Sequence, residues 1–169
     1  YNVSRAESPF GAPNERYASA AQELHQWGES GVLKRDSTPA FYVYEQVTNI
    51  AGRSHTRRGF FARLQLTPFT DGIVRPHERT MSGPKADRLQ LLKATQTNIS
   101  PIFMLYRDPE GIANALLADA TTTEPIFEAT DGRGDQHRLW AIADKSRIEV
   151  LRKTAAASKA TIADGHHRY

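Results

Sequence analysis

The densest group of chemically active side chains lies in six consecutive residues near the end of the sequence, Asp164-Gly165-His166-His167-Arg168-Tyr169. Gly165 permits a backbone conformation that other residues resist, and it has no Cβ to obstruct a ligand. If a helix begins at His166, its first N–H groups and its positive end favour an anion such as a phosphate. Arg168 adds a planar guanidinium group that matches phosphate oxygens. The pattern therefore predicts an anion-binding turn.

The other side chains of this turn suit proton transfer or orientation. His166 and His167 can donate hydrogen bonds or exchange protons near neutral pH. Asp164 could fix the tautomer of one histidine or contact a metal ion bound to the phosphates. A polar helix cap with surface histidines is the alternative interpretation. Two adjacent histidines and an arginine directly after a strand and a glycine favour a phosphate- or nucleotide-binding turn instead.

A second cluster, Arg75-Pro76-His77-Glu78-Arg79-Thr80, follows a short apolar segment. We expect Glu78 to stay ionised between Arg75 and Arg79, and its carboxylate could serve as a general base, with His77 beside it. We assign Arg75 and Arg79 to substrate binding. A surface loop of ion pairs is the alternative, and it is the better interpretation of this window taken alone.

A metal site formed by His77, Glu78, His166 and His167 is conceivable, because imidazole and carboxylate groups are zinc ligands. We predict no metal bound by these side chains, since the two clusters are far apart in the sequence. No histidine follows His77-Glu78 at the helical spacing that zinc proteases use. The chain has no cysteine, which excludes thiolate catalysis, disulfides and Cys-type zinc sites.

The composition is that of an ordinary globular protein. Of the 169 residues, 39% are hydrophobic and 24% are charged. No apolar run approaches the roughly 20 residues that a membrane helix needs, and no secretory leader is visible, so we expect a cytoplasmic protein with no membrane partner. The net charge of +3 leaves room for an anionic ligand but makes nucleic acid an unlikely partner. Because the chain begins at Tyr1, we expect a fragment of a longer protein.

Helices and strands are interleaved along the chain. After an irregular lead-in over residues 1–12, apolar spacing predicts a helix over 14–30 and another over 85–98, with Leu89 and Leu92 turned inward. A third helix opens at Asp108-Pro109 and is predicted to bury one side. A fourth is capped by Asp144 or Ser146. The predicted inward faces of the third and fourth helices are Ile112, Ala115 and Leu116, and Ile148, Leu151 and Ala155.

Two hairpins are expected, one from strands 40–48 and 59–67 and the other from strands 125–130 and 137–143. Short strands are predicted at 73–74, at 102–106, where the apolar residues indicate burial, and at 161–162. The order shows no regular alternation of strand and helix. We therefore predict an α+β fold with a mixed sheet in a single domain over residues 1–169.

Three segments together resemble the conserved bacterial domain-of-unknown-function family 1015: PHERTMSGPKADRLQLLKAT, NISPIFMLY and IADGHHRY. VLKRDSTPAFYVYEQ is similar to that family as well. The resemblance runs from about Asn14 to Tyr169. Proteins of this family are longer at both ends, and the helix expected after DGHHRY is missing from this chain.

A more distant similarity is to the ParB/sulfiredoxin-like free-serine kinases. It covers Pro76-His77-Glu78, Pro101-Ile102 and residues 162–169. It implies that Glu78 is the base toward a serine hydroxyl and that Gly165, His166, His167 and Arg168 hold nucleotide phosphates. It also implies Mg²⁺ with ATP or ADP. We expect a nucleotide-dependent phosphotransferase acting on a small hydroxyl substrate. The alternatives are a non-catalytic nucleotide- or nucleic-acid-binding module and a structural domain.

Overall fold

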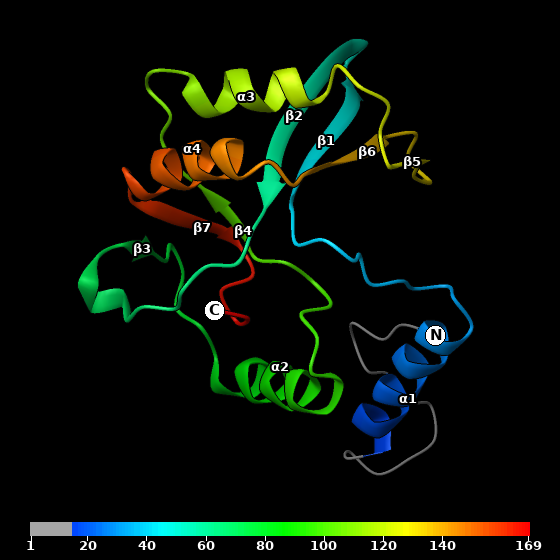
Figure 1. The fold of residues 1–169 in the computed structure, drawn as a ribbon. Coiled ribbons are helices and arrows are strands. Elements are labelled where there is room, and N and C mark those ends of the chain that lie inside the picture. The colour runs from blue at the N-terminus through cyan, green and yellow to red at the C-terminus, as the bar shows by residue number, and fades with distance from the viewer. Residues whose placement is uncertain (1–14) are drawn as a thin grey trace. The chain divides into compact units, whose positions relative to one another are not determined.

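The computed structural model describes residues 15–169, so the predicted lead-in over 1–12 lies outside the described residues. Helices and two separate sheets confirm the predicted α+β class (Figure 1). The chain divides into two compact units. Of the described residues, unit 1 contains 15–36, Arg75–Leu105 and Thr161–Tyr169, and unit 2 contains Ser37–Val74 and Tyr106–Ala160. Each unit joins segments that are far apart in the sequence. The single domain stays a prediction.

Unit 2 is built on a four-stranded antiparallel sheet in the order β2-β1-β6-β5. Its strands are β1 (Phe41–Ile50), β2 (Arg53–Phe61), β5 (Phe127–Thr130) and β6 (Gln136–Ile142). Glu45 of β1 is buried, and Arg58 and Arg138 stand directly opposite it on the two neighbouring strands. Their guanidinium groups reach the carboxylate at 2.6 and 3.5 Å. A buried carboxylate needs such partners, so these cross-strand pairs hold the register of β1.

Both predicted hairpins are present, but the second strand of the first one was placed too late in the sequence. The chain reverses at Ala51 and Gly52, which have φ values of 50° and 77°. Two consecutive positive φ values are typical of the tight turns that suit the twist of a hairpin. The polar segment from Arg53 therefore pairs with β1, and Leu64 and Leu66 lie beyond the strand with 52% and 65% of their surface exposed.

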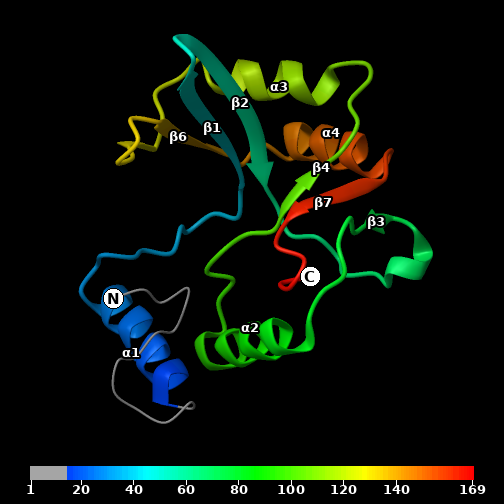
Figure 2. The same cartoon turned by 180° about the vertical axis from the view of Figure 1, so that it is seen from behind.

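Two helices, α3 (Ile112–Ala120) and α4 (Lys145–Ala156), pack with the sheet to form the core of unit 2 (Figures 1 and 2). The buried residues of this core are Val43, Ala113, Leu117, Ala120, Trp140, Ile142 and Leu151. The Asp144 carboxylate accepts a hydrogen bond of 2.9 Å from the Arg147 N–H, which confirms Asp144 as the cap of α4. A short 3₁₀ helix, η1 (Phe69–Asp71), lies near the end of the first segment of this unit, Ser37–Val74.

The face predicted for α3 was wrong. Ala113, Leu117 and Ala120 are buried, whereas Ile112 is 45% exposed. The helix IANALLADA is apolar on more than one side, so its periodicity fits two different stripes, and only the packing against the sheet selects one of them.

Unit 1 contains the helices α1 (Glu15–Glu29) and α2 (Ser82–Thr95). Tyr17, Ala20 and Leu91 form its small buried core. The Tyr17 hydroxyl donates a 2.8 Å hydrogen bond to Asp87, which ties α1 to α2. The inward residues predicted for α2 were wrong: Leu89 and Leu92 are 48% and 40% exposed, while Leu91 is buried. Because only one side of α2 meets α1, neighbouring leucines on the helix differ in exposure.

The second sheet has the order β3-β7-β4, formed by β3 (Val74–Arg75), β7 (Ala160–Asp164) and β4 (Phe103–Leu105). The predicted burial of 102–106 was wrong, because Phe103 and Leu105 are 41% and 54% exposed on β4. An edge strand is covered on fewer sides than a central one, and Ile162 in the middle strand β7 is fully buried. Among residues 15–169, no helix combines the length and apolar character that crossing a bilayer requires.

Candidate active site at the His77-Glu78 loop and the Gly165 turn

The strands β3 and β7 bring the two sequence clusters together. The Ala160 N–H donates at 3.0 Å to the carbonyl of Ile73, the residue before β3. Two residues after β3, a ring nitrogen of His77 reaches the Ile162 carbonyl of β7 at 2.7 Å. The contacts advance in the same direction along both segments. The loop that follows β3 and the turn that follows β7 therefore leave the sheet at the same end. All the side chains described below belong to unit 1.

His166 is the buried centre of the site, with 3% of its surface exposed. Its Nδ1 lies 3.2 Å from Oε1 of Glu78, and its Nε2 accepts a hydrogen bond of 3.3 Å from the His77 backbone N–H. An atom that accepts from an N–H carries the lone pair, so the proton of the neutral ring is on Nδ1, the nitrogen that faces Glu78. Asp164 contacts Arg168 in the structure, and the groups beside the two ring nitrogens of His166 are Glu78 and the His77 amide.

His77 is oriented by the backbone of β7. A carbonyl oxygen can only accept, so the 2.7 Å contact with Ile162 places a proton on Nδ1 of His77 and leaves the lone pair on Nε2. The His77 and His166 rings meet edge to face, with centroids 4.4 Å apart. One ring nitrogen from each histidine and one carboxylate oxygen of Glu78 all lie within 4.8 Å of one another.

Gly165 and Arg168 form a compact turn. Gly165 has a φ of 93°, and a Cβ built on it would lie 2.6 Å from Nη2 of Arg168. The Arg168 side chain thus lies directly over the glycine, where it donates to Oδ2 of Asp164 at 2.8 Å and to the Pro101 carbonyl at 3.2 Å. Its Nε is buried and has no acceptor among residues 15–169. A buried donor left without an acceptor costs the folded state about 1–3 kcal/mol.

The helix expected at His166 is a turn in the structure. The Arg168 N–H donates to the Gly165 carbonyl at 2.8 Å, three residues back, and residues 166–168 are in turn conformation. A turn of this length has no helix macrodipole of its own. The positive charge available to an anion comes from the Arg168 guanidinium.

The remaining predicted residues lie around this centre. His167 accepts a 3.3 Å hydrogen bond from the Met81 N–H and is not part of the group formed by His77, Glu78 and His166. Arg75 and Arg79 are exposed. Within the described part of the chain neither of them forms an ion pair with Glu78, whose charged-group contact is His166.

The comparisons with known proteins give one match. The whole chain, residues 1–169, matches the family described as "Protein of unknown function (DUF1015)". The chain belongs to this family. No curated protein and no solved structure matches it. The family predicted from the sequence is confirmed, and the similarity to ParB/sulfiredoxin-like kinases stays a prediction.

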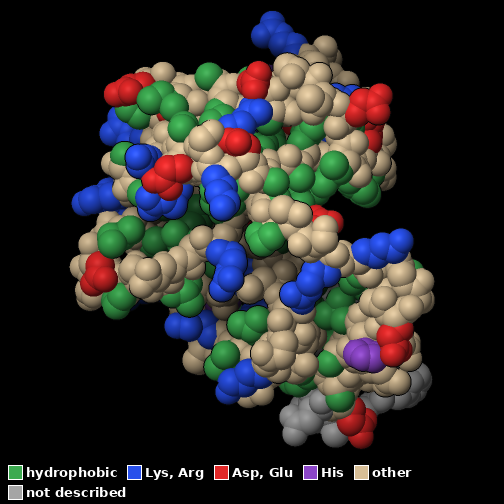
Figure 3. All heavy atoms as spheres, viewed as in Figure 1, with side chains coloured by type: hydrophobic (Ala, Val, Ile, Leu, Met, Phe, Trp, Pro, Cys, Tyr) green, Lys and Arg blue, Asp and Glu red, His purple; other side chains and the backbone are tan. Residues whose placement is uncertain are grey.

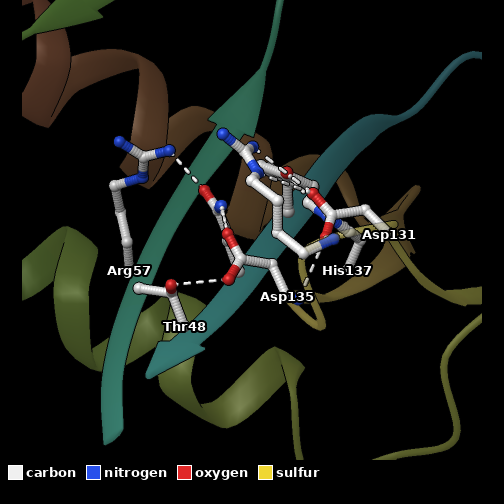
Figure 4. A network of polar contacts seen from close by, with 8 residues as sticks. Thr48, Arg57, Asp131, Asp135 and His137 are labelled. Carbon is white, nitrogen blue, oxygen red and sulfur yellow. Dashed lines mark hydrogen bonds and ion pairs between the residues drawn. The ribbon is translucent and has the colours of Figure 1, made fainter. Parts of the chain in front are cut away.

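This DUF1015 chain also has a polar network in unit 2, at the turn that joins β5 to β6 (Figure 4). Asp135 accepts from the side chains of Thr48 and Gln46, at 2.6 and 2.8 Å. Hydrogen bonds, the strongest from the Arg133 backbone N–H, lower the pKa of Asp131 to about 2. The network links the turn to β1, so it stabilises the hairpin.

Sequence reasoning missed the groups that hold the site in place. They are the carbonyl oxygens of Ile162 and Pro101 and the backbone N–H groups of His77 and Met81. Every residue carries these groups, so no residue type marks them. The only available signal was the predicted strand at 161–162, which places backbone carbonyls beside a neighbouring segment.

Proposed function

We propose that this DUF1015 chain carries the site of a nucleotide-dependent phosphotransferase that acts on a small hydroxyl compound, with free serine as the first candidate. ATP or ADP with Mg²⁺ is the proposed donor, and the cytoplasm is the proposed location. The observation that supports the proposal best is the 3.2 Å contact between Glu78 and His166, because it joins a carboxylate to the turn that is proposed to hold phosphates.

Glu78 is proposed as the general base. Its Oε1 lies 3.2 Å from Nδ1 of His166, and the side chain is 49% exposed. An exposed carboxylate that is oriented by a neighbouring histidine can accept the proton of a substrate hydroxyl. His77 has its lone pair on Nε2 and is proposed to assist in moving that proton.

The phosphates are proposed to bind at Gly165, His166, His167 and Arg168. A phosphate that displaced Asp164 from Arg168 would give the guanidinium a bidentate partner and its Nε an acceptor. The released Asp164 carboxylate could then contact Mg²⁺. The exposed Arg75 and Arg79 are proposed to attract the anionic groups of the substrate. Phosphoryl transfer depends mainly on such positioning and charge neutralisation.

The test combines calorimetric titration of ATP, ADP and CTP in the presence of Mg²⁺ with mass spectrometry of serine and other small hydroxyl compounds as acceptors. Glu78→Gln should lower the transfer rate by about 10²- to 10⁴-fold and leave nucleotide affinity unchanged. Arg168→Ala should weaken nucleotide binding. Glu110→Gln, an exposed glutamate in unit 2, is the control.

The proposal is wrong if no nucleotide binds with Mg²⁺ and Arg168→Ala changes nothing. Nucleotide binding that persists in Glu78→Gln, with no phosphorylated product from any acceptor, would point to the alternative of a non-catalytic nucleotide switch. On the face that Figure 3 shows, Lys and Arg side chains lie among acidic and hydrophobic ones, which gives a nucleic-acid module little support.

A further inference from the structure

We propose that His77, Glu78 and His166 form a binding site for a divalent transition-metal ion of the zinc type. The three residues come from two segments of the chain, and His77 and His166 are 89 positions apart in the sequence. The prediction against a metal site relied on that sequence separation, but in the fold the three side chains lie close together. Two imidazoles and one carboxylate are the donor set of catalytic zinc sites and of the non-haem iron facial triad.

The distances suit a tetrahedral ion. Zinc bonds of about 2.0–2.1 Å place two ligand atoms of a tetrahedral site about 3.3 Å apart. Nδ1 of His166 and Oε1 of Glu78 are 3.2 Å apart, so this pair already has the spacing of two ligands. One possible ligand atom from each of His77, Glu78 and His166 lies within 4.8 Å of the other two. Reaching the spacing of a tetrahedral site therefore needs a movement of at most about 1.5 Å, which a small shift of the exposed His77-Glu78 loop provides.

The surroundings prepare His77 as a ligand. Its Nδ1–H is bound to the Ile162 carbonyl at 2.7 Å, which directs the lone pair of Nε2 away from the backbone. A histidine ligand of a metal usually donates its other N–H to a carbonyl or carboxylate in this way, and the contact fixes both the tautomer and the ring orientation.

Metal binding requires one rearrangement at His166. Coordination through Nδ1 moves the ring proton to Nε2, which now accepts from the His77 backbone N–H at 3.3 Å. That hydrogen bond is lost, because two N–H groups then face each other. The change of tautomer is a spectroscopic signature of metal binding, and it is visible in the ¹⁵N chemical shifts of the ring.

The donor set selects the class of metal ion. Imidazole nitrogens suit Zn²⁺, Co²⁺ and Ni²⁺, whereas Mg²⁺ prefers oxygen ligands and keeps its waters. The site is therefore distinct from the Mg²⁺ that accompanies the nucleotide in the proposed function, and it does not rest on that function. If both hold, a metal ion at Glu78 occupies the carboxylate that phosphate transfer uses as its base.

The test is calorimetric titration of the full chain, free of any affinity tag, with Zn²⁺ and with Co²⁺ alone. Visible absorption of the Co²⁺ complex reports its coordination geometry. We expect one ion per chain. Glu78→Gln and His166→Asn should each weaken binding at least about 100-fold, the upper end of what the loss of an outer partner costs. His167→Asn is the matched control, since the neighbouring histidine lies outside the group.

Glu78 is 49% exposed, so Glu78→Gln is expected to fold even if a change at the buried His166 does not. The proposal is overturned if the unaltered chain shows no saturable binding of either ion, or if Glu78→Gln binds the ion as tightly as the unaltered chain and the His167→Asn control do. Nucleotide titrations are independent of this experiment, so failure of the metal site and failure of the proposed phosphate transfer can be distinguished.

Discussion

Gly165 shapes the candidate site because it has no Cβ. The space that a Cβ would occupy is filled by the Arg168 guanidinium, which is thereby held between Asp164 and the Pro101 carbonyl. The backbone at φ 93° is one that glycine adopts easily and other residues adopt with strain. The glycine therefore serves both the turn and the placement of the arginine.

We predict that Gly165→Ala lowers the free energy of unfolding by about 1–2 kcal/mol, the strain of an L-residue at positive φ. Its Cβ also displaces Arg168, so nucleotide affinity should fall as well. Urea unfolding and calorimetric titration measure the two effects. Gly132→Ala is the control, because that glycine has open space around it and no positive φ. Equal stability of the two variants would contradict the account of the turn.

Most residues of the candidate site could be identified from the sequence, but the groups that they contact could not. The acid-base side chains His77, Glu78 and His166 stand out by type, and the structure brings them into contact. Which atom contacts which depends on strand pairing and on backbone groups, so the sequence did not predict the contact between Glu78 and His166. Arg168 was predicted to face an anion, and in the structure it binds Asp164.

At the scale of elements, the turn between β5 and β6 depends on one carboxylate. Asp131 accepts from the backbone N–H groups of Arg133 and Asp135, at 2.8 and 3.0 Å, and lies 3.5 Å from Nε2 of His137. These donors favour the ionised form, and they lower the pKa of Asp131 from its usual 3.8 to about 2. The charge of this one residue therefore stabilises the hairpin.

The sign of the pH effect follows from that shift. A carboxyl whose pKa is lower in the folded state adds stability above its unfolded pKa of about 3.9, and the contribution is lost as the pH falls through the folded value. Asp131→Asn removes the titrating group. We therefore predict that the stability difference between the unaltered chain and Asp131→Asn is full at pH 7 and shrinks between about pH 4 and 2.

Urea unfolding at a series of pH values measures this difference, with the exposed Glu124→Gln as a control for the general effect of acid. A difference that stays constant from pH 7 to about 2 would show that the hydrogen bonds, and not the charge, stabilise the turn.

The existence of the helices and strands was predictable, whereas their faces and ends were less so. Apolar periodicity found α1 and α4, and the strand signals at 125–130 and 137–143 found the β5–β6 hairpin, because these signals are local. The buried sides of α2 and α3 depend on which surface meets them. Leu89 was predicted to be buried and is exposed, and Leu91 is buried against α1. Only the assembled fold decides between such neighbours.

At the scale of the whole molecule, the chain supplies each compact unit with its own core. The core of unit 1 is small, with three buried residues on two helices, whereas the core of unit 2 has seven on a sheet and two helices. Because each unit is assembled from separated segments, neither core forms from one stretch of sequence. The two tryptophans are divided between the units, with Trp27 beside the first core and Trp140 inside the second.

That division makes the stability of unit 2 measurable by itself. Leu151 of α4 is fully buried in its core, and Leu151→Ala should lower the unfolding free energy reported by Trp140 by about 2–5 kcal/mol through lost burial and a residual cavity. The measurement is tryptophan fluorescence during urea unfolding in a Trp27→Phe background, where Trp140 is the remaining tryptophan. Leu66→Ala removes the same atoms from a side chain that is 65% exposed and should cost far less. Equal losses at Leu151 and Leu66 would contradict a core centred on α4 and the antiparallel sheet.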